Sequence, residues 1–367
     1  MKILDKYIVK QFLVTFVVMS TLLLTITVVI DISNKINRLN DNGSSVKQAL
    51  VEFYPYWSVW IFNTFLPIAV FITVIFFTSK IANNTEIVAI TSGGISFPRF
   101  STPYFFTALF LGLISLGVNH FLLPKASKKK NEFEYKYLLT ESKKMDYTQV
   151  KSISVLLSKD EYLFVNEYRR EPQSGAGFLY QKFDQKDKLK LIKNLRADQI
   201  TWQPNDSTFL LSNYYIREID KKGREKLSSG TQMSFPLKVT PDELLPEGYA
   251  SEVMTSPELL RFIEREQEKG STNLGSYKTQ FHRRSSISFS VLVLTFLGLS
   301  LASEKRRGGI GLNLAIGLLI AFMYIFLGES LISFSKNEIL SPVLATWMSN
   351  FLFGALALYL FIRRANQ

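Results

Sequence analysis

The sequence predicts a polytopic α-helical membrane protein with six spans and an all-β, jelly-roll-like extracytoplasmic domain inserted between spans three and four. Apolar blocks flank a single polar block in the 367-residue chain. Six apolar runs reach the roughly 20 residues that a helix needs to cross a bilayer, and the polar block contains short segments with strand composition. We therefore expect a first transmembrane half at residues 1–123, a β domain at 124–284 and a second transmembrane half at 285–367.

The spans are expected where apolar residues continue without a break. The first contains QFLVTFVVMSTLLLTITVVI, which has no charged residue. It is too long for a signal-peptide core, and no small-x-small cleavage site follows it, so an uncleaved anchor is expected. The preceding MKILDKYIVKQF is amphipathic, and we expect it to lie along the inner surface before the chain turns into the bilayer. The six spans are expected at residues 11–30, 56–78, 100–122, 286–303, 309–333 and 340–362.

Lysine and arginine in the short connections indicate the orientation, because cytoplasmic loops are enriched in these residues. A cytoplasmic N-terminus leaves four basic residues in the short outer loops, namely Lys35, Arg38, Lys47 and Lys336. It places ten on the cytoplasmic side, namely Lys2, Lys6, Lys10, Lys80, Arg99, Lys305, Arg306, Arg307, Arg363 and Arg364. We therefore expect both termini in the cytoplasm and residues 124–284 outside it. Nucleic-acid binding explains the net charge of +12 poorly, because the basic residues face opposite compartments.

The polar block changes to strand character near residue 150. Its segments are short and rich in β-branched and aromatic residues: SISVLLS, YLFVNEY, GFLYQKFD, KLIKNLRADQITW, STFLLSNYYIREID and TQMSFPLKV. Turn sequences such as PNDS and DKKGRE separate them without intervening helices, a pattern typical of a β-sandwich or jelly-roll. The segment SPELLRFIEREQEKG then predicts a helix that returns the chain to the membrane. The chain has no cysteine, so core packing must hold this domain together without disulfides.

Several kinds of chemistry are not predicted. The sequence contains no GxxxxGK[ST] loop for nucleotide phosphates and no carboxylate cluster with metal spacing. The two histidines, His120 and His282, lie at membrane boundaries, where an interfacial role is favoured over catalysis or metal binding. Glu329 is the one ionisable candidate inside a span, and its place near the outer end favours a headgroup or interface role. We therefore expect a non-catalytic chain without a bound cofactor or metal, and any transport must draw its energy from another subunit.

The segment NNTEIVAITSGG between spans two and three predicts a short cytoplasmic helix. Asn84 and Thr85 are typical helix-start residues, a carboxylate lies in the first turn, and two glycines end the pattern. Its acidic and apolar side chains are Glu86, Ile87, Val88 and Ile90. Such a face suits a groove on a soluble partner. The alternative is an interfacial helix lying on lipid, which is less favourable for an acidic residue beside anionic lipid.

The fifth span carries small residues at helical spacing, Gly311 with Ala315 and Gly317 with Ala321. Small residues four positions apart let two helices approach closely. Packing within the chain and packing against a second subunit both explain these pairs.

Motifs from nearly the whole chain add a further signal. They are LDKYIVKQFL, EIVAITSGGIS, VNHFLLPKA, ADQITW, VTPDEL, MTSPELLRFIE, HRRSSISFSVLVLTFLGLSLASEKRRGGIGLNLAIG and SPVLATWMSNFLF. In their order, their spacing and the layout of three spans, a β insert and three spans, they resemble the LptF/LptG family. This family comprises the permeases of the lipopolysaccharide export ABC transporter.

The resemblance implies that residues 84–95 form a coupling helix. In that family, two paralogous permeases pair and bind two copies of a cytoplasmic ABC ATPase, which carries the ATP and magnesium. A short helix between spans two and three docks into the ATPase. The coupling residues implied here are Glu86, Ile87, Val88, Ile90 and Gly93.

The resemblance also implies a substrate and its route. Lipopolysaccharide would leave the inner membrane of a Gram-negative bacterium sideways, through a cavity lined by the first and fifth helices of both permeases. The β domain would join that of a single-span periplasmic protein as a bridge toward the outer membrane. The implied phosphate-binding cations are Lys35, Arg38, Arg283 and Arg284, and the implied gate or subunit-packing residues are Thr25, Gly311 and Ala315.

Two other functions remain open on the residues alone. Another ATP-driven envelope permease, such as one that extracts lipoproteins, has the same general parts, although such permeases typically carry fewer spans and a differently placed insert. A membrane-anchored sensor or scaffold explains the β domain, but it predicts a cytoplasmic signalling domain that the sequence does not show. Copurification of an ATPase would distinguish either kind of permease from a sensor. The lipid that crosslinks to the first helix would distinguish a lipopolysaccharide permease from a lipoprotein permease.

Overall fold

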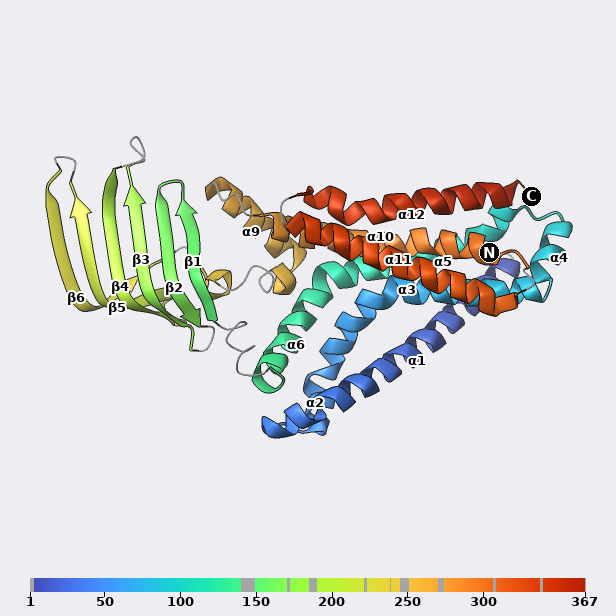
Figure 1. The fold of residues 1–367 in the computed structure, drawn as a ribbon, viewed down its shortest axis with the longest axis horizontal. Helices are drawn as coiled ribbons and strands as arrows, with labels where there is room; N and C mark the ends of the chain where they lie inside the picture. Colours follow the sequence, from blue (N-terminus) through green and yellow to red (C-terminus); the bar gives the residue numbers. More distant parts are fainter. Residues whose placement is uncertain are drawn as a thin grey trace. The chain divides into compact units, whose positions relative to one another are not determined.

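The computed structural model describes residues 3–139, 149–169, 172–184, 190–220, 223–237, 239–244, 251–269, 274–305, 308–336 and 339–366. The chain divides into two compact units, one of Met1–Phe133 with Lys278–Gln367 and one of Glu134–Tyr277. The first unit is helical, and the second is built mainly on a β-sheet (Figure 1).

Among the described residues, six long helices are apolar enough to cross a membrane, which confirms the predicted number of spans. A helix forms in each apolar run because its backbone polar groups find no water in hydrocarbon and must bond to one another. The long helices are α1 (Ile3–Asp41), α3 (Tyr54–Asn83), α5 (Phe97–Gly117), α10 (Gly275–Ala302), α11 (Gly309–Lys336) and α12 (Pro342–Ala365). The π-helical turn Val118–Leu122 joins α5 to α6 (Leu123–Tyr137), and the short helices are α2 (Val46–Glu52) and α4 (Glu86–Ser92).

Helix α1 continues without interruption along its whole length. The turn that the sequence suggested between an N-terminal surface helix and the first span therefore does not occur within residues 3–41. Ile8 and Phe12 are fully buried, and Arg99 at the start of α5 donates two hydrogen bonds of 2.8 and 2.9 Å to Asp5. These contacts hold the amphipathic segment against the bundle, so it extends the span instead of lying on the membrane surface.

The six spans differ in how far the rest of the chain covers them. In α10, 72% of the most apolar stretch is buried, and the corresponding fraction in α3 is 50%. These two helices form the centre of the bundle. The fraction is 33% in α5 and in α12, but 17% in α11 and 11% in α1. Helices α1 and α11 therefore leave most of their apolar surface uncovered by their own chain.

The second unit contains one antiparallel sheet with the strand order β1-β2-β3-β4-β5-β6. Each strand pairs with the next in sequence, as expected for antiparallel strands joined by short hairpin connections. The all-β character predicted for the insert is confirmed. The strands are β1 (Gln149–Ser158), β2 (Glu161–Arg169), β3 (Ser174–Phe183), β4 (Leu191–Gln203), β5 (Thr208–Ile219) and β6 (Glu225–Phe235). A 3₁₀ turn, Pro241–Leu244, and helix α9 (Ser256–Lys269) follow.

A row of irregular positions, which we name the crease, crosses the sheet from edge to edge. In every pair of neighbouring strands, one residue of each strand near the middle of the sheet has no register partner. Further shifts in the described strands occur only near strand ends, at Leu156/Ser158 and Lys182/Phe183. The middle positions join into one line, namely Ser152, Asn166, Gly177, Asp198, Asn213 and Thr231. Gly177 and Asn213 have positive φ angles of 67° and 51°, and Asn213 Nδ2 donates a 3.1 Å hydrogen bond to Asp198 Oδ2. Glycine and asparagine are the residues that tolerate this left-handed conformation best.

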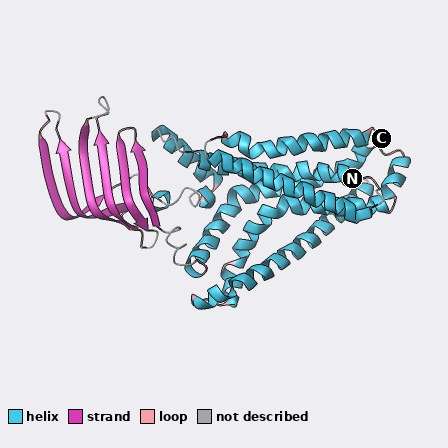
Figure 2. Cartoon of the chain, in the orientation of Figure 1, coloured by secondary structure: helices cyan, strands magenta, loops and turns pink. Residues whose placement is uncertain are grey.

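The crease lets a single sheet enclose an apolar core. Alternate residues of a regular strand share one face, yet in β4 the buried residues change from Leu195 and Ala197 to Ile200 across Asp198. These residues belong to one apolar cluster. The strands curve strongly along their length (Figure 2), so both halves turn apolar side chains inward. Strands paired in sequence order thereby enclose an apolar core in the predicted β domain.

Candidate functional site

Helix α4 lies between α3 and α5, at the end of the helical unit where both chain termini also lie (Figure 1). Ile87 is 2% exposed and belongs to the apolar core of the bundle, and Ile90 packs against the same core. Val88 is 55% exposed. Of the three apolar side chains predicted for docking, Val88 is therefore the one that a partner protein reaches most readily.

Backbone geometry sets both ends of α4. Thr85 has a φ of 62°, a left-handed conformation that is strained for a β-branched residue, and its hydroxyl donates to the carbonyl of Asn84 at 2.6 Å. Gly93 caps the end of the helix, and Gly94 follows with a φ of 83°, which glycine adopts without strain. Sharp turns on both sides therefore make α4 a separate short element between two spans.

The Glu86 side chain contacts other parts of the chain. The Tyr7 hydroxyl donates to Glu86 Oε2 at 3.1 Å, and Asn84 Nδ2 donates to Glu86 Oε1 at 3.1 Å. With the pairing of Arg99 and Asp5, the Tyr7 hydrogen bond ties the α4–α5 segment to the first turns of α1 at two points. Sequence reasoning missed these two contacts, because their partners are 79 and 94 positions apart.

Helices α1 and α11 carry the residues predicted at the gate. Thr25 is exposed on α1, and its hydroxyl donates to the carbonyl of Thr21 at 2.8 Å, which reduces the cost of placing it in hydrocarbon. Gly311 and Ala315 are exposed on α11, and a Cβ added to Gly311 would meet no atom within 4 Å. These positions are open in the single chain.

The second small-residue pair of α11 is internal. A Cβ added to Gly317 would lie 2.3 Å from Cδ1 of Ile75 in α3, and Ala321 is fully packed. Gly317 and Ala321 therefore allow close approach of α11 to α3. Packing within the chain explains this pair, whereas the pair of Gly311 and Ala315 faces outward.

Lys35, a predicted phosphate ligand, is held by three neighbours. Its Nζ lies 2.9 Å from Asp31 Oδ2 and over the rings of Phe53 and Trp57, at 4.9 and 5.6 Å from the ring centroids. Tyr54 donates a 2.9 Å hydrogen bond to the same carboxylate. The Lys35 charge is thus already paired and its side chain is fixed.

The other three predicted phosphate ligands differ in their surroundings. Arg38 is exposed on α1, and it forms no ion pair within the described part of the chain. Arg283 is paired with Glu329 of α11, and Arg284 is buried in α10. Arg38 therefore has the guanidinium most available to a ligand.

A buried polar network joins three helices at the π-helical turn, and the sequence reasoning did not identify it. Asn63 of α3 and Asn119 exchange two amide hydrogen bonds of 2.8 and 3.0 Å, and Asn119 also donates to Ser288 Oγ of α10 at 3.2 Å. The neighbouring His120 ring lies 3.1 Å from Ser285 Oγ. The described residues contain no group of three side chains able to hold a metal ion. Asparagines within apolar runs were the available sequence signal, since buried amides need partners.

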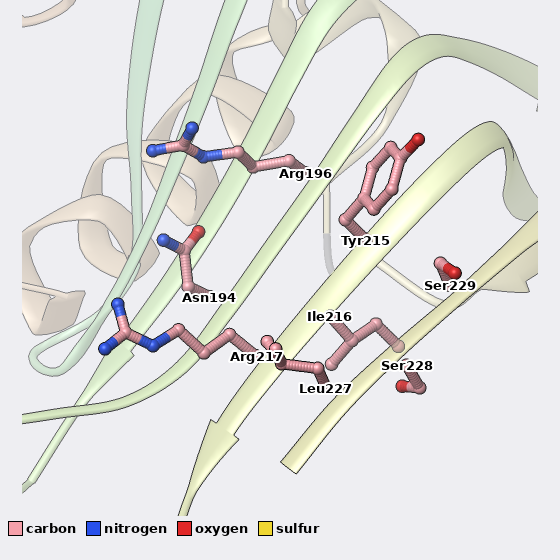
Figure 3. Close-up of a pocket in the computed structure, with 8 residues that line it drawn as sticks. All are labelled: Asn194, Arg196, Tyr215, Ile216, Arg217, Leu227, Ser228 and Ser229. Atoms are coloured by element: carbon pink, nitrogen blue, oxygen red, sulfur yellow. The ribbon is translucent and has the colours of Figure 1, made fainter. Parts of the chain in front are cut away.

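A hollow of about 470 Å³ lies on the sheet across β4, β5 and β6. Figure 3 shows Asn194 and Arg196 of β4 and Arg217 of β5 pointing to the same side. A hydrogen bond from Arg217 holds the pKa of the Glu225 carboxyl below its usual value. Leu227 supplies an exposed apolar wall. Cations beside an apolar surface suit an amphipathic anion.

The described part of the chain is that of a polytopic membrane protein with a β-sheet unit inserted between its third and fourth long helices. A family model described as the lipopolysaccharide export system permease LptF/LptG matches residues 6–363. The chain belongs to the LptF/LptG family and is thus a permease of the lipopolysaccharide export ABC transporter. The resemblance found in the sequence motifs is confirmed.

Permeases of this family are non-catalytic transmembrane subunits. Membership implies an inner-membrane location and other subunits of a transport complex. A comparison with curated proteins found no match.

Proposed function

We propose that the chain pairs with a second, paralogous permease and takes lipopolysaccharide sideways from the outer leaflet of the inner membrane into a cavity between the two. Two copies of a cytoplasmic ABC ATPase, which bind ATP and magnesium, supply the energy. The observation that carries this proposal is the low coverage of α1 and α11, in which 11% and 17% of the membrane-crossing stretch are buried. These are the helices that would line the cavity.

The uncovered face of α11 suits acyl chains or the matching face of a second permease. Its side chains Leu318, Leu319, Phe322 and Phe326 are all large, apolar and exposed. Moving an acyl chain into water costs roughly 0.8 kcal/mol for each methylene group. A lipid with several chains would therefore face a cost on the order of tens of kcal/mol. A passage between apolar helices avoids that exposure.

The proposed orientation places both termini, α4 and the turn between α10 and α11 in the cytoplasm. Two contacts support a common end for these segments. The Phe97 and Phe361 rings lie 5.4 Å apart, and Arg364 donates to the carbonyl of Ser303 at 3.3 Å. The location of these segments at one end of the bundle agrees with the expectation that basic residues are enriched on the cytoplasmic side. Residues 124–284 then lie in the periplasm.

Coupling to the ATPase is assigned to α4. Its exposed side, including Val88, would contact the ATPase, while its buried side packs on the bundle. The hydrogen bond between Tyr7 and Glu86 and the pair of Asp5 and Arg99 connect the α4–α5 segment with α1. A displacement of α4 would therefore reach α1, one of the two cavity helices.

The creased sheet would continue the route through the periplasm. The hollow beside Arg196 and Arg217 has an exposed apolar wall at Leu227, so it offers surface for both parts of an amphipathic anion. Strand β6 lies at an edge of the sheet, and an edge strand can pair with a strand of another protein. The β domain of a single-span periplasmic protein is the proposed partner in this bridge.

Photo-crosslinking tests the lateral cavity. A crosslinker at Ala315 of α11 or at Thr25 of α1 is expected to capture lipopolysaccharide or the partner permease in native membranes, because both positions are exposed. The matched control is Ala321, on the same helix as Ala315 but 2% exposed, which should capture residues of its own chain. If Ala315 and Thr25 also crosslink only within their own chain, these faces are internal packing and the proposal fails.

Substrate capture gives a second test. Arg38→Gln is expected to lower lipopolysaccharide crosslinking about tenfold, since a hydrogen bond to a charged group contributes about 1.5–3 kcal/mol. Basal ATP hydrolysis should persist, because Arg38 lies near the opposite end of α1 from its contacts with α4. Lys35→Gln should instead reduce the abundance of folded protein, because it removes the ion-pair partner of Asp31. The Lys35→Gln/Arg38→Gln double variant should combine both effects.

The measurement is crosslinked lipid per molecule of folded protein, compared between each variant and the parent. Equal crosslinking in Arg38→Gln and the parent, at equal abundance, would remove Arg38 from the capture site. The proposed phosphate ligands would then be Arg283 and Arg284.

A further inference from the structure

A cavity of about 110 Å³ lies between α3, α10, α11 and α12, away from the uncovered faces of Gly311 and Ala315. Its apolar lining includes Phe65 and Ile68 of α3 and Ile325 of α11. The volume is well above the roughly 10–15 Å³ that one water molecule requires. Phe65 and Ile325 are also exposed on the outside of the bundle, so the cavity borders the surface that faces lipid.

One hydroxyl group in this cavity has no partner. Ser349 of α12 is 3% exposed and lines the cavity, and its Oγ forms no hydrogen bond within the described part of the chain. Facing it, Gly328 of α11 has no side chain, and a Cβ added there would lie 3.5 Å from Ser349 Oγ. Leaving a buried hydroxyl unbonded is unfavourable, so Ser349 Oγ is placed to bond with a polar group that enters the cavity.

The neighbouring polar side chains are already bonded to one another. Ser286 Oγ donates to the carbonyl of Thr346 at 2.5 Å, and Asn350 Nδ2 donates to Ser286 Oγ at 2.8 Å. The Tyr324 hydroxyl donates to Asn350 Oδ1 at 2.9 Å. This network fixes the cavity wall and leaves Ser349 as the hydroxyl available to a ligand.

Two opposite charges lie together in the same lining. Arg283 of α10 is ion-paired with Glu329 of α11, and their side chains are 29% and 56% exposed. Both residues stand near the membrane end at which α10 begins and α11 ends. A ligand that approaches from the lipid side therefore meets a cation, an anion and, deeper in the cavity, an unbonded hydroxyl.

We propose that this cavity binds the headgroup of a phospholipid carrying phosphoethanolamine. The phosphate would bind Arg283, and the ammonium group would enter the cavity between Glu329 and Ser349 Oγ. A primary ammonium has three N–H donors, so it can bond to the carboxylate and to the hydroxyl oxygen together. The acyl chains would lie along Phe65 and Ile325. This site includes Arg283, the alternative phosphate ligand for lipopolysaccharide, but none of the predicted gate residues Thr25, Gly311 and Ala315. The inference goes beyond the proposed function, because it assigns the cavity a lipid other than the transport substrate.

Two other common headgroups fit less well. Phosphocholine has the same net charge as phosphoethanolamine, but its quaternary nitrogen has no N–H group to donate to Ser349. Phosphoglycerol lacks the cation, so it would place its negative charge beside Glu329 without compensation. The structure therefore favours ethanolamine over choline through hydrogen bonding, and ethanolamine over glycerol through charge.

The test measures which lipids the full chain retains when it is purified with its partners. The complex is exchanged into detergent that contains equimolar phosphatidylethanolamine, phosphatidylcholine and phosphatidylglycerol. Native mass spectrometry then measures the bound lipids. The parent should retain phosphatidylethanolamine about tenfold over each competitor, since hydrogen bonds to charged groups have about this effect. Glu329→Gln and Ser349→Ala should each remove most of this preference. Ser300→Ala is the matched control, because Ser300 Oγ is also buried and without a partner among the described residues but lies outside this cavity.

Three results would overturn the proposal. One is equal retention of the ethanolamine and choline lipids by the parent, and another is an unchanged preference in both Glu329→Gln and Ser349→Ala at equal thermal stability. The third is displacement of bound phosphatidylethanolamine by added lipopolysaccharide, which would assign the cavity to the transport substrate. None of these readouts depends on export activity, so failure here leaves the lateral cavity of α1 and α11 untouched.

Discussion

Glu86→Lys is expected to detach the ATPase and stop lipopolysaccharide export while the variant still inserts into the membrane. The change removes the carboxylate that accepts hydrogen bonds from Tyr7 and Asn84, and it reverses the charge at the start of α4. We also expect this carboxylate to contact a basic residue of the ATPase. A hydrogen bond to a charged group contributes about 1.5–3 kcal/mol, so ATPase recovered per permease should fall about tenfold or more. Purification in mild detergent measures this ratio, and Glu86→Ala should show a smaller decrease.

Two further variants separate docking from transmission. Val88→Asp alters an exposed side chain of α4 and should weaken ATPase binding without disturbing the bundle. Tyr7→Phe removes the tie between α1 and α4 and should leave the ATPase bound while export per ATP hydrolysed falls. Tyr359→Phe, at an exposed tyrosine of α12, is the matched control. Unchanged ATPase recovery and export in Glu86→Lys would refute the coupling role of α4.

The membrane helices could be predicted because their signal is local. About 20 apolar residues without a charge identify a span whatever surrounds it. Lys35 and Asp31 are also four residues apart on one helix, a spacing at which side chains meet, so that pair was accessible to sequence reasoning. The pairing of Arg283 with Glu329 was not, because it joins two helices across 46 positions and depends on how they pack.

The orientation of α4 shows a second limit. Its periodicity predicted an apolar face formed by Ile87, Val88 and Ile90, but an apolar face does not reveal what covers it. Ile87 packs in the core of its own chain, and the neighbouring Val88 is left outside. That distinction depends on where α3 and α5 hold the short helix.

The sheet shows the same division between local and long-range information. Short β-branched segments predicted the strands, whereas their pairing in one creased sheet depends on register. Asn166, Gly177, Asp198 and Asn213 are individually ordinary turn-forming residues inside strand patterns. They mark a crease only when pairing aligns them in one row, and strand register is set by contacts across the whole sheet.

Gly177→Val is expected to disrupt the crease and to destabilise the sheet unit by about 2–5 kcal/mol. A left-handed conformation costs a residue with a side chain about 1–2 kcal/mol, and overpacking adds about 1–3 kcal/mol. A Cβ on Gly177 would lie 2.4 Å from Asn166 Nδ2 and 2.9 Å from Asn166 Cβ. The second contact matters most, because rotating the Asn166 side chain moves Nδ2 but leaves Cβ where the backbone of β2 holds it.

Gly223→Val supplies the matched control. Gly223 also has a positive φ, of 78°, but a Cβ there would meet no atom within 4 Å. It should therefore incur only the conformational cost, about 1–2 kcal/mol, and the difference between the two variants isolates the steric contact at the crease.

The measurement is the rate of protease cleavage within residues 134–277 of the full chain, together with the thermal midpoint. Equal rates in the two variants would mean that the crease relaxes around the added side chain. A faster rate in Gly177→Val, with ATPase recovery unchanged, would show that both halves of the sheet need this row of residues to enclose their core. Export should then fail at the sheet while coupling at α4 stays intact.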